Sequence, residues 1–452
     1  MQLDRLISAL EPIEVENASS VEIADLAYDS REVAPGSLFF CVPGANVDGH
    51  ERAGDAVAAG AVAVVVERRL DLAVPQVVVR SVRAAMPVAA NEFFGHPSRD
   101  LEIAAVTGTN GKTTTAFLLR SILEAAGRRP ALLTNIERRI GGELTPTGLN
   151  TPEAIDLQRL LRAMVEAGDR SCAMEATSIA AVQGRLAGTR FAVLVFTNLT
   201  QDHLDFHGSM ESYFAAKRGL FDQADHAVVN VGDEWGRRLA GELPEAITFT
   251  PDDPLPELDL HLRGRFNRAN ALGAVLAARA IGIEETAIRA GIERVQGVPG
   301  RFEAVDEGQP FSVIVDYAHT PDSLANVLQA ARGLGEGRLL VVFGAGGDRD
   351  RQKRPLMGAV GERARHRAIV TTDNPRSEDP AAIAAEVSAG ELEVIVDRRA
   401  AIEEAIGAAE AGDVVVIAGK GDDREMEIAG GSVPFDDRDV ARAALRRTGA
   451  TA

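Results

Sequence analysis

A glycine-rich segment with a single lysine follows an apolar run near residue 105. It reads Thr107-Gly108-Thr109-Asn110-Gly111-Lys112-Thr113-Thr114-Thr115 and leads into a helical run. A strand, a glycine turn and a helix in this order favour phosphate binding, because glycines let backbone N–H groups approach oxygen and the helix N-terminus is partly positive. Lys112 then reaches the terminal phosphates, and the Thr113 hydroxyl suits Mg²⁺. Val106 replaces the first glycine of the full motif. A chance Gly-Lys-Thr in a surface turn is the alternative, and the flanking strand and helix argue against it.

Three further residues of chemical interest come later in the chain. Glu175 ends a predicted strand, His203 follows the next strand, and Lys217 lies on the helix after that. A carboxylate, an imidazole and an amine beside a Mg²⁺-nucleotide supply oxygen and nitrogen ligands for hard cations. A carboxylate at a strand end is also common as a helix cap or a surface charge. The phosphate-binding segment is what favours the metal site over that alternative.

The elements that must position these residues alternate between strand and helix. We predict strands at 103–107, 131–134, 171–175, 191–198 and 227–231, and helices at 114–126, 153–167 and 210–222. This order is typical of a mostly parallel sheet with helices on both faces. Ligands gather at the carboxyl ends of such strands, which is where the polar residues above lie.

A second alternation of strands and helices begins after residue 301. Its expected strands are 311–317, 339–343, 368–372, 393–396 and 414–418. Every strand except the fourth runs into a polar, turn-forming cluster, at 316–321, 344–350, 373–376 and 419–423. One glycine-rich turn after a strand is weak evidence, but four that converge on one edge of a sheet predict a binding site.

The first 95 residues form a separate unit. Short β-rich segments are expected at 21–28, 37–42 and 61–67, with a helix near 52–59. Glycine and proline interrupt the chain near residues 95 and 299. A chain of 452 residues also exceeds what one hydrophobic core usually supports. We therefore predict three domains, at residues 1–95, 96–298 and 299–452.

Composition limits the partners and the compartment. The 67 acidic residues exceed the 48 basic ones, for a net charge of -19, which disfavours a nucleic-acid partner. An anionic ligand must therefore be held by a local cationic pocket.

The two cysteines, Cys41 and Cys172, are predicted to be buried thiols of a reducing compartment. The chain starts with no secretory segment, and apolar runs such as 191–196 are far shorter than the roughly 20 residues of a membrane span. A cytoplasmic protein without a membrane span is expected.

Together, the central and C-terminal motifs closely resemble those of the Mur ligases, ATP-dependent amide-forming enzymes of peptidoglycan precursor synthesis. Within that family the similarity is to the synthetases that add the third residue of the peptide. The similarity extends along nearly the whole chain and includes Tyr28-Asp29-Ser30-Arg31, which in the family belongs to a uridine-nucleotide domain. The resemblance implies a three-domain α/β fold, with an N-terminal uridine-nucleotide-binding domain, a central parallel sheet of the P-loop ATPase type and a C-terminal Rossmann-like domain.

The resemblance also implies roles for single residues on the nucleotide side. The residues implied to bind ATP are Gly108, Thr109, Asn110, Gly111, Lys112, Thr113, Thr114, Asn267, Asn270, Arg301 and Asp316. Mg²⁺ is implied at Thr113, Glu175, His203 and Lys217, the last of which matches a lysine that the family carbamylates into an anionic oxygen ligand. The catalytic residues are then expected to be Lys112, Lys217, His203 and Glu175.

On the substrate side, two groups of residues match family motifs. The group implied to hold the UDP-linked acceptor is Ser30, Asn150, Thr151, Thr177, Gln183 and Arg185. The group implied to bind the incoming amino acid is Arg349, Asp373, Asn374, Pro375, Arg376, Gly419 and Asp423. The sequence Asp-Asn-Pro-Arg is the form associated with meso-diaminopimelate. A guanidinium at Arg376, helped by Arg349, can pair bidentately with the distal carboxylate that L-lysine lacks.

Three motifs depart from the family pattern. The family's Glu-Val-Ser-Ser-His reads Glu175-Ala176-Thr177-Ser178-Ile179, so a histidine is missing beside the metal region. The Asn-Thr-Thr of the acceptor loop reads Leu149-Asn150-Thr151. The final Gly-Lys-Gly-His-Glu reads Gly419-Lys420-Gly421-Asp422-Asp423, so the glutamate that binds the ammonium of diaminopimelate is replaced by a shorter aspartate.

The resemblance implies that ATP phosphorylates the D-glutamyl side-chain carboxylate of UDP-MurNAc-L-Ala-D-Glu, and that the amine of meso-diaminopimelate attacks the acyl phosphate. A monomer is expected. Three alternatives stay open: the same ligase with L-lysine or another diamino acid, another amide ligase such as a folylpolyglutamate synthetase, and a non-catalytic nucleotide-binding paralogue. The uridine-type first unit argues against the second alternative, and Lys112, His203 and Lys217 argue against the third.

Overall fold

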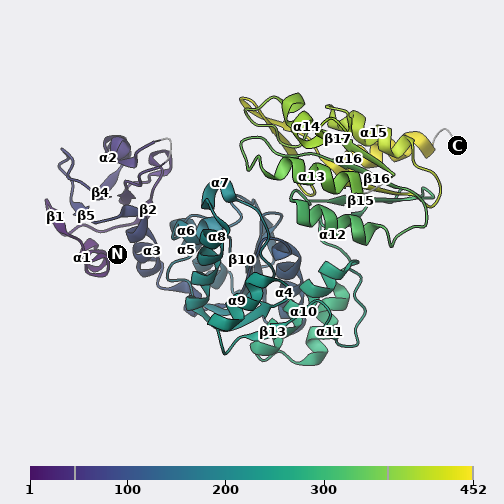
Figure 1. Cartoon of the computed structure of the whole chain (residues 1–452). Helices are drawn as coiled ribbons and strands as arrows, with labels where there is room; N and C mark the ends of the chain where they lie inside the picture. The colour runs from purple at the N-terminus through teal and green to yellow at the C-terminus, as the bar shows by residue number, and fades with distance from the viewer. Residues whose placement is uncertain (45–46, 364–365, 450–452) are drawn as a thin grey trace. The chain divides into compact units, whose positions relative to one another are not determined.

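The structure is a computed structural model that describes residues 1–44, 47–363 and 366–449. Within these residues the strands form three α/β sheets and one small two-stranded sheet (Figure 1). Two compact units can be separated. The first comprises Met1–Thr107, Gly127–Leu194 and Ala216–Ala227, and the second comprises Gly108–Ala126, Val195–Ala215 and Val228–Ala452.

The first sheet lies near the N-terminus and has five strands. Their order is β1 (Glu14–Glu16), β5 (Gln76–Val78), β4 (Ala61–Val66), β3 (Ser37–Phe40) and β2 (Asp25–Ala27). Only β1 is antiparallel to its neighbour. Side chains alternate between the two faces of a strand. Accordingly, Leu38 and Phe40 pack with α1 (Leu3–Leu10) and α3 (Val82–Phe93), whereas Phe39 packs with α2 (Ala53–Ala58).

The second sheet contains the strand that leads into the glycine-rich segment at 107–115. Its eight strands follow the order β13 (Ile247–Phe249), β12 (Ala224–Asn230), β11 (Phe191–Phe196), β6 (Glu102–Thr107), β10 (Ser171–Glu175), β7 (Pro130–Leu133), β8 (Arg138–Ile140) and β9 (Glu143–Thr145). β6, β10 and β7 are parallel, while β8 and β9 form an antiparallel hairpin at one edge. β10 is buried along its whole length, as expected for a strand with both faces covered.

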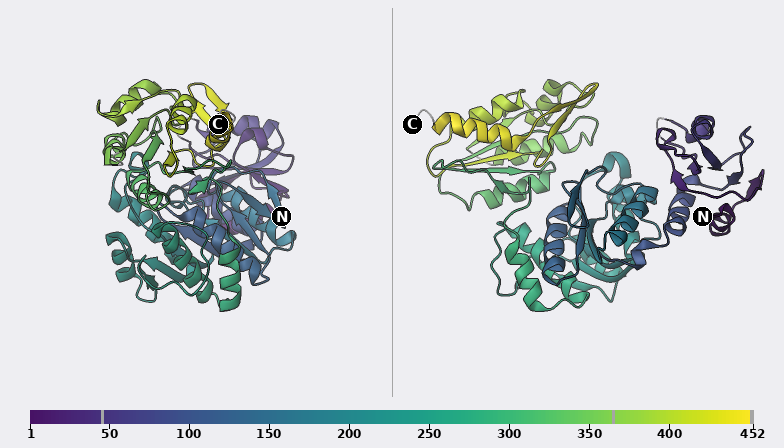
Figure 2. Two further views of the ribbon diagram at one scale, coloured as in Figure 1. Left: turned by 90° about the vertical axis from the view of Figure 1, so that its right-hand side faces the viewer. Right: turned by 180° about the vertical axis from the view of Figure 1, so that it is seen from behind.

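The third sheet lies in the C-terminal part of the chain. Its order is β14 (Glu303–Ala304), β15 (Ser312–Asp316), β19 (Val414–Ala418), β16 (Leu339–Phe343), β17 (Arg367–Val370) and β18 (Glu393–Val394). Figures 1 and 2 show helices on both of its faces. Alternate residues of each strand contact different helices, so that Val341 faces one layer and Val342 the other. The helices of the first layer are α12 (Pro321–Ala331), α13 (Lys353–Arg363) and α14 (Pro380–Ser388), and those of the second are α15 (Arg398–Gly407) and α16 (Asp437–Gly449).

The predicted α/β fold class is confirmed, and every predicted strand lies on or overlaps an observed one. The antiparallel pairs β8–β9 and β20–β21 (Glu425–Ile428 and Gly431–Pro434) were not predicted, because their exposed residues carry no run of buried apolar side chains. The predicted helix 210–222 is α8 (Met210–Arg218) followed by a 3-10 turn, η4 (Gly219–Gln223). Among the described residues, no helix is both long and apolar enough to cross a membrane.

Candidate active site

The glycine-rich segment at 107–115 has the predicted strand, turn and helix. β6 ends at Thr107, and α4 (Lys112–Ala125) starts directly after the glycine turn. Gly108 and Gly111 have φ values of +142° and +88°, a region that favours glycine. A Cβ atom on Gly108 would lie 1.9 Å from Thr197 Oγ1, and one on Gly111 would lie 2.3 Å from Asn270 Oδ1. Both glycines are therefore required by the close approach of neighbouring side chains as well as by the backbone.

The segment after β11 holds this turn in place, which sequence reasoning missed. Thr197 Oγ1 donates to the Asn110 carbonyl oxygen at 2.6 Å, and Asn198 Oδ1 accepts from the Asn110 backbone N–H at 3.0 Å. The Thr109 hydroxyl lies 3.2 Å from the Tyr213 hydroxyl. Because β11 and β6 are neighbours in the sheet, their carboxyl ends meet, and this strand order, which no local sequence pattern gives, brings Thr197 and Asn198 to the turn.

Lys112 bends back over the glycine turn. Its Nζ donates to the carbonyl oxygens of Gly108 at 3.1 Å and of Thr109 at 2.7 Å. Thr113 and Thr114 follow in the first turn of α4 and are buried. The ammonium group is thus close to a helix N-terminus, and this arrangement attracts anions.

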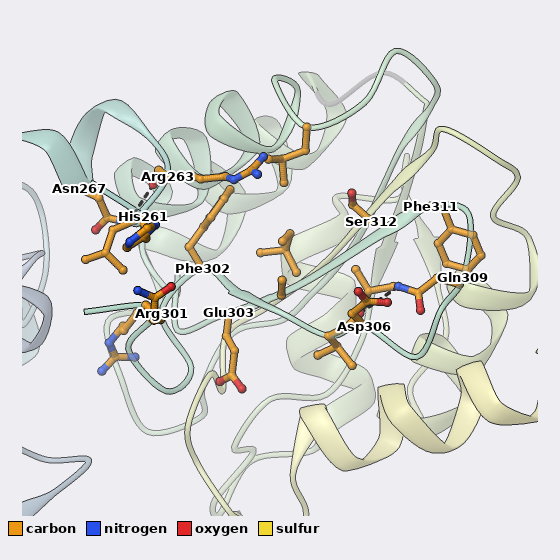
Figure 3. A pocket seen from close by; sticks show the side chains of 18 of the residues that line it. His261, Arg263, Asn267, Arg301, Phe302, Glu303, Asp306, Gln309, Phe311 and Ser312 are labelled. Carbon is orange, nitrogen blue, oxygen red and sulfur yellow. Dashed lines mark hydrogen bonds between the residues drawn. The ribbon is translucent and has the colours of Figure 1, made fainter. Parts of the chain in front are cut away.

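Two asparagines of α10 (Arg265–Ala280) lie in its first turns. Asn267 Nδ2 donates to the Arg263 carbonyl oxygen at 2.8 Å, and Asn270 Nδ2 donates to Asn267 Oδ1 at 3.2 Å. Asn267 and Arg301 also line a cavity of about 730 Å³. Figure 3 shows further side chains around this cavity, among them His261, Arg263, Phe302, Glu303, Asp306, Gln309, Phe311 and Ser312.

Arg301 is fixed from several sides. Its guanidinium pairs with Asp422 at 3.1 Å and lies 4.2 Å from the centre of the Tyr317 ring, and Nη2 donates to Thr113 Oγ1 at 3.4 Å. Asp422 is one of the positions that depart from the family pattern. The structure therefore gives this aspartate a role that sequence reasoning missed, namely to hold Arg301 beside the first turn of α4.

Asp316, the last residue of β15, supports the turn that carries Arg301. Its carboxylate accepts hydrogen bonds from the backbone N–H groups of Phe302 at 2.6 Å and of Ala318 at 2.7 Å. Burial raises the pKa of the Asp316 carboxyl, although Arg301 and these two N–H groups oppose the change. Asp316 thus acts on the turn that carries Arg301.

The expected metal ligands lie on separate elements. Glu175 is the buried last residue of β10, His203 precedes α7 (Leu204–His207) with a φ of +55°, and Lys217 is buried on α8. Asp202 Oδ2 lies 3.4 Å from His203 Nε2 and 3.8 Å from His319 Nε2. Across the described ranges, no group of three His, Cys, Asp or Glu side chains is arranged to hold a metal ion alone. Of the expected ligands, the Glu175 carboxylate is the kind of group that Mg²⁺ takes, usually together with water and phosphate oxygens.

Four of the expected acceptor residues lie close together. The Thr151 hydroxyl donates to the Glu175 carbonyl oxygen at 3.2 Å and accepts from the Thr177 hydroxyl at 3.1 Å. Arg185 donates to the Thr151 carbonyl oxygen at 3.0 Å, and Gln183, two residues earlier, directly follows α6 (Ser178–Val182). The two other expected acceptor residues lie elsewhere: Asn150 is exposed in the loop before Thr151, and Ser30 begins a 3-10 turn, η1 (Ser30–Glu32).

The expected amino-acid residues gather at the carboxyl ends of the third sheet. Asn374 Nδ2 donates to Asp423 Oδ2 at 3.2 Å, and Gly347 donates its N–H to the Asn374 carbonyl oxygen at 2.9 Å. Gly419 has a φ of +120°, and a Cβ atom there would lie 2.3 Å from Asp373 Oδ2. The turns after β16, β17 and β19 are thus joined, as the predicted convergence requires.

Cations lie near the Asp373 carboxylate of this cluster. Burial alone would raise the pKa of the Asp373 carboxyl, but Arg398, Lys420 and His319 outweigh burial and hold that pKa below its usual value. Lys420 also donates to Asn374 Oδ1 at 2.9 Å. Arg376, in the left-handed region at φ +52°, and the exposed Arg349 both lie near Gly346, while Pro375 joins Asn374 to Arg376.

Comparison with known proteins identifies the family. Three family models match the chain: the Mur ligase family catalytic domain at residues 22–94, the Mur ligase middle domain at 106–254 and the Mur ligase glutamate ligase domain at 300–421. UDP-N-acetylmuramoyl-L-alanyl-D-glutamate--2,6-diaminopimelate ligase of Solibacter usitatus is 43% identical, with 99% of each chain covered. The chain belongs to the Mur ligase family. Ligases of the same name from Geobacillus kaustophilus and Streptomyces coelicolor are 43% and 42% identical to this Mur ligase, with at least 94% of each chain covered.

Solved structures agree with this assignment. A UDP-N-acetylmuramoyl-L-alanyl-D-glutamate--2,6-diaminopimelate ligase aligns with a TM-score of 0.67 and 31% identity, with 98% of the Mur ligase and 99% of that chain covered. MurF ligase from Thermotoga maritima, solved in complex with ADP, has the same fold, with a TM-score of 0.62 and 19% identity over 94% and 96% of the two chains.

Proposed function

We propose that this Mur ligase uses ATP to join meso-diaminopimelate to the D-glutamyl residue of UDP-MurNAc-L-Ala-D-Glu, as a step of peptidoglycan precursor synthesis. Its similarity to diaminopimelate ligases over 99% of the chain carries the proposal. The cationic Arg376 beside the joined turns of the third sheet also supports it, because a guanidinium matches a carboxylate that diaminopimelate has and L-lysine lacks.

The glycine turn and Lys112 bind the phosphates of ATP, and Asn267, Asn270 and the cavity beside Arg301 take its base and ribose. The γ-phosphoryl group passes to the D-glutamyl carboxylate, and the resulting acyl phosphate is attacked by the amine. The tetrahedral intermediate collapses to the amide and releases phosphate. Such a transfer depends mainly on positioning and charge neutralisation. Thr151, Thr177, Gln183 and Arg185 hold the acceptor so that its carboxylate meets the γ-phosphate.

Mg²⁺ is part of the proposal, and Thr113, Glu175, His203 and carbamylated Lys217 are the residues that would hold it. When bound, the metal neutralises the charge of the phosphate oxygens. Thr113 Oγ1 accepts from Arg301 in the present structure. We therefore infer that Arg301 moves from this hydroxyl to a phosphate oxygen when the nucleotide binds.

We also propose the three domain boundaries given by the sequence, at 1–95, 96–298 and 299–452, and a cytoplasmic monomer as the working form. The cytoplasmic assignment is supported by the substrates, since ATP and UDP-linked precursors are cytoplasmic solutes. Binding of the UDP-linked acceptor by Ser30 and Asn150 stays a prediction.

Phosphate release tests the proposal. The purified ligase is assayed with ATP, Mg²⁺ and UDP-MurNAc-L-Ala-D-Glu, and with meso-diaminopimelate, L-lysine or another diamino acid in parallel. We expect phosphate release only when the acceptor and meso-diaminopimelate are both present. Phosphate release with L-lysine and not with meso-diaminopimelate, each with the acceptor present, would contradict the amino-acid assignment. Activity with a folate acceptor would favour a folylpolyglutamate synthetase, and no turnover with any pair would favour a nucleotide-binding paralogue.

A further inference from the structure

The β20–β21 hairpin is fastened to the Asp-Asn-Pro-Arg turn. Arg376 donates its backbone N–H to the Glu427 carbonyl oxygen at 3.0 Å, and Glu427 donates its own N–H to Asn374 Oδ1 at 3.0 Å. Lys420 strengthens the connection, because its Nζ donates to the Glu425 carbonyl oxygen at 2.6 Å. These contacts fix where the side chain of Glu427 can lie.

That side chain meets the guanidinium of Arg376. Glu427 Oε2 lies 2.5 Å from Arg376 Nε, and on the other side Arg376 Nη1 donates to the Gly347 carbonyl oxygen at 2.8 Å. The Glu427 side chain is 53% exposed and that of Arg376 is 20% exposed, so a solute can reach the pair. An accessible cation and anion thus lie side by side at the carboxyl ends of the third sheet.

Asp423, the residue that the family resemblance assigns to the ammonium of diaminopimelate, is 31% exposed and is already engaged by neighbouring side chains. Its carboxylate accepts from Asn374 Nδ2 at 3.2 Å and lies 3.6 Å from Lys420 Nζ. Burial raises the pKa of the Asp423 carboxyl, although Lys420 opposes the change. Asp423 is also one methylene shorter than the family's glutamate. The more accessible carboxylate beside Arg376 is that of Glu427.

We propose that Glu427 is a specificity-determining residue that binds the ammonium group on the distal carbon of diaminopimelate, while Arg376 binds the carboxylate on the same carbon. This inference rests on the proposed function. The distal end of diaminopimelate is an amino-acid zwitterion, and an adjacent carboxylate and guanidinium match both of its charges. Without ligand the two side chains neutralise each other, so neither charge lacks a partner.

Glu427→Gln tests the proposal, because the amide keeps the size of the side chain and loses its charge. Two amino acids are compared: meso-diaminopimelate and L-2-aminopimelate, which keeps the distal carboxylate and lacks the distal ammonium. A charge-assisted hydrogen bond that is partly exposed to water predicts about a tenfold rise in KM for meso-diaminopimelate. The KM for L-2-aminopimelate is expected not to rise, since that compound offers Glu427 no ammonium.

Glu425→Gln is the matched control. Glu425 lies on the same strand, and its carboxylate accepts from the Ser432 hydroxyl at 2.7 Å, a bond that glutamine can also accept. We expect unchanged KM values for both amino acids. KM for ATP should be unchanged in both variants, which reports an intact fold.

Each other result has a defined meaning. Equal KM increases for both amino acids in Glu427→Gln would show that Glu427 acts only by orienting Arg376, and would overturn the proposal. A lower KM for meso-diaminopimelate would show that Glu427 competes with the substrate carboxylate, which also overturns it. If the unmodified ligase released no phosphate with meso-diaminopimelate, the proposed function itself would fail, and the role of Glu427 with it.

Discussion

Lys217 is a lysine that lies in the protein interior. Its side chain is only 1% exposed on α8. Removing an ammonium from water is costly unless anions compensate it. In the proposed function, carbamylation would convert the amine into an anion that serves as a metal ligand. Composition and spacing could not distinguish this lysine from an ordinary surface lysine, because its burial on α8 is a property of the folded chain.

Lys217→Ala is expected to lower turnover by about a hundredfold or more, because the anionic ligand is lost. Added short carboxylic acids, such as formate or acetate, should restore part of the rate if the carbamate serves only as a ligand. Arg218→Ala is the neighbouring control, since Arg218 pairs with Asp222 at the surface. Steady-state phosphate release measures all three effects. Full activity of Lys217→Ala would refute the assignment.

Arg376→Lys tests the carboxylate contact. A lysine keeps the charge but not the planar fork, so bidentate pairing with the distal carboxylate is lost. We expect KM for meso-diaminopimelate to rise about tenfold or more, with KM for ATP unchanged. An unchanged KM for the amino acid would argue against Arg376 as the carboxylate ligand.

At the scale of elements, the strand ends and their turns do the positioning. The glycine turn after β6 is held by the segment after β11, and the turn that carries Arg349 is held by α13 and α14. Arg354 is fully buried on α13 and donates to the Gly346 carbonyl oxygen at 3.2 Å and to Glu378 and Glu386 at 2.7 Å. Residues of these helices thus hold in place the turn that carries Arg349.

Gly108→Ala is expected to weaken ATP binding by about tenfold or more, because the new Cβ atom would collide with Thr197 Oγ1 and alanine disfavours a φ of +142°. Gly241→Ala in α9 (Glu234–Glu242) is the control, since no atom lies within 4 Å of its added Cβ. That substitution should leave binding unchanged and raise helix stability slightly. Nucleotide titration by fluorescence or calorimetry measures both. Equal affinities would contradict the required close approach.

Glu378 gives a pH-dependent prediction for the turn at 346–350. Its hydrogen bonds with Arg354 and with the Asp348 backbone N–H lower the pKa of Glu378 from 4.5 to about 2. A carboxyl with a lowered pKa stabilises the fold above pH 4.5 and loses this contribution as the pH falls toward 2. Glu378→Gln should therefore lower the melting temperature at pH 6 and have little effect near pH 2. The exposed Glu362→Gln should show no such difference in thermal unfolding.

At the scale of the whole molecule, the net charge of -19 opposes the binding of anionic substrates. Local cations must therefore compensate, and Lys112, Arg301, Arg349 and Arg376 lie in the segments assigned to ligands. The residues assigned to ATP come from two proposed domains: 108–114, Asn267 and Asn270 lie within residues 96–298, and Arg301 and Asp316 lie within residues 299–452. A ligand that contacts both favours the conformations in which the two parts engage it together.

We therefore expect a non-hydrolysable ATP analogue and the acceptor together to reduce the radius of gyration measured by small-angle X-ray scattering. Either ligand alone should have a smaller effect. Scattering curves that stay unchanged with both ligands bound would contradict closure of the C-terminal part onto the nucleotide site.

The sequence alone determined the α/β class, the order of the main strands and helices, and the glycine turn with Lys112. These features depend on local periodicity and on short motifs, which act within a few residues. The family motifs also indicated Arg376 and Lys217, although their chemistry comes from the resemblance rather than from spacing.

Only the tertiary structure decided which distant residues meet. The sheet order brings Thr197 and Asn198 to the glycine turn, joins Asp422 to Arg301, and allows the β20–β21 hairpin to place Glu427 against Arg376. Strand order is a non-local property, set by the burial of whole sheet faces and not by any single segment. For this reason, residues around the site that depart from the family motifs, or that no sequence pattern marks, can be assigned a role only from the folded structure.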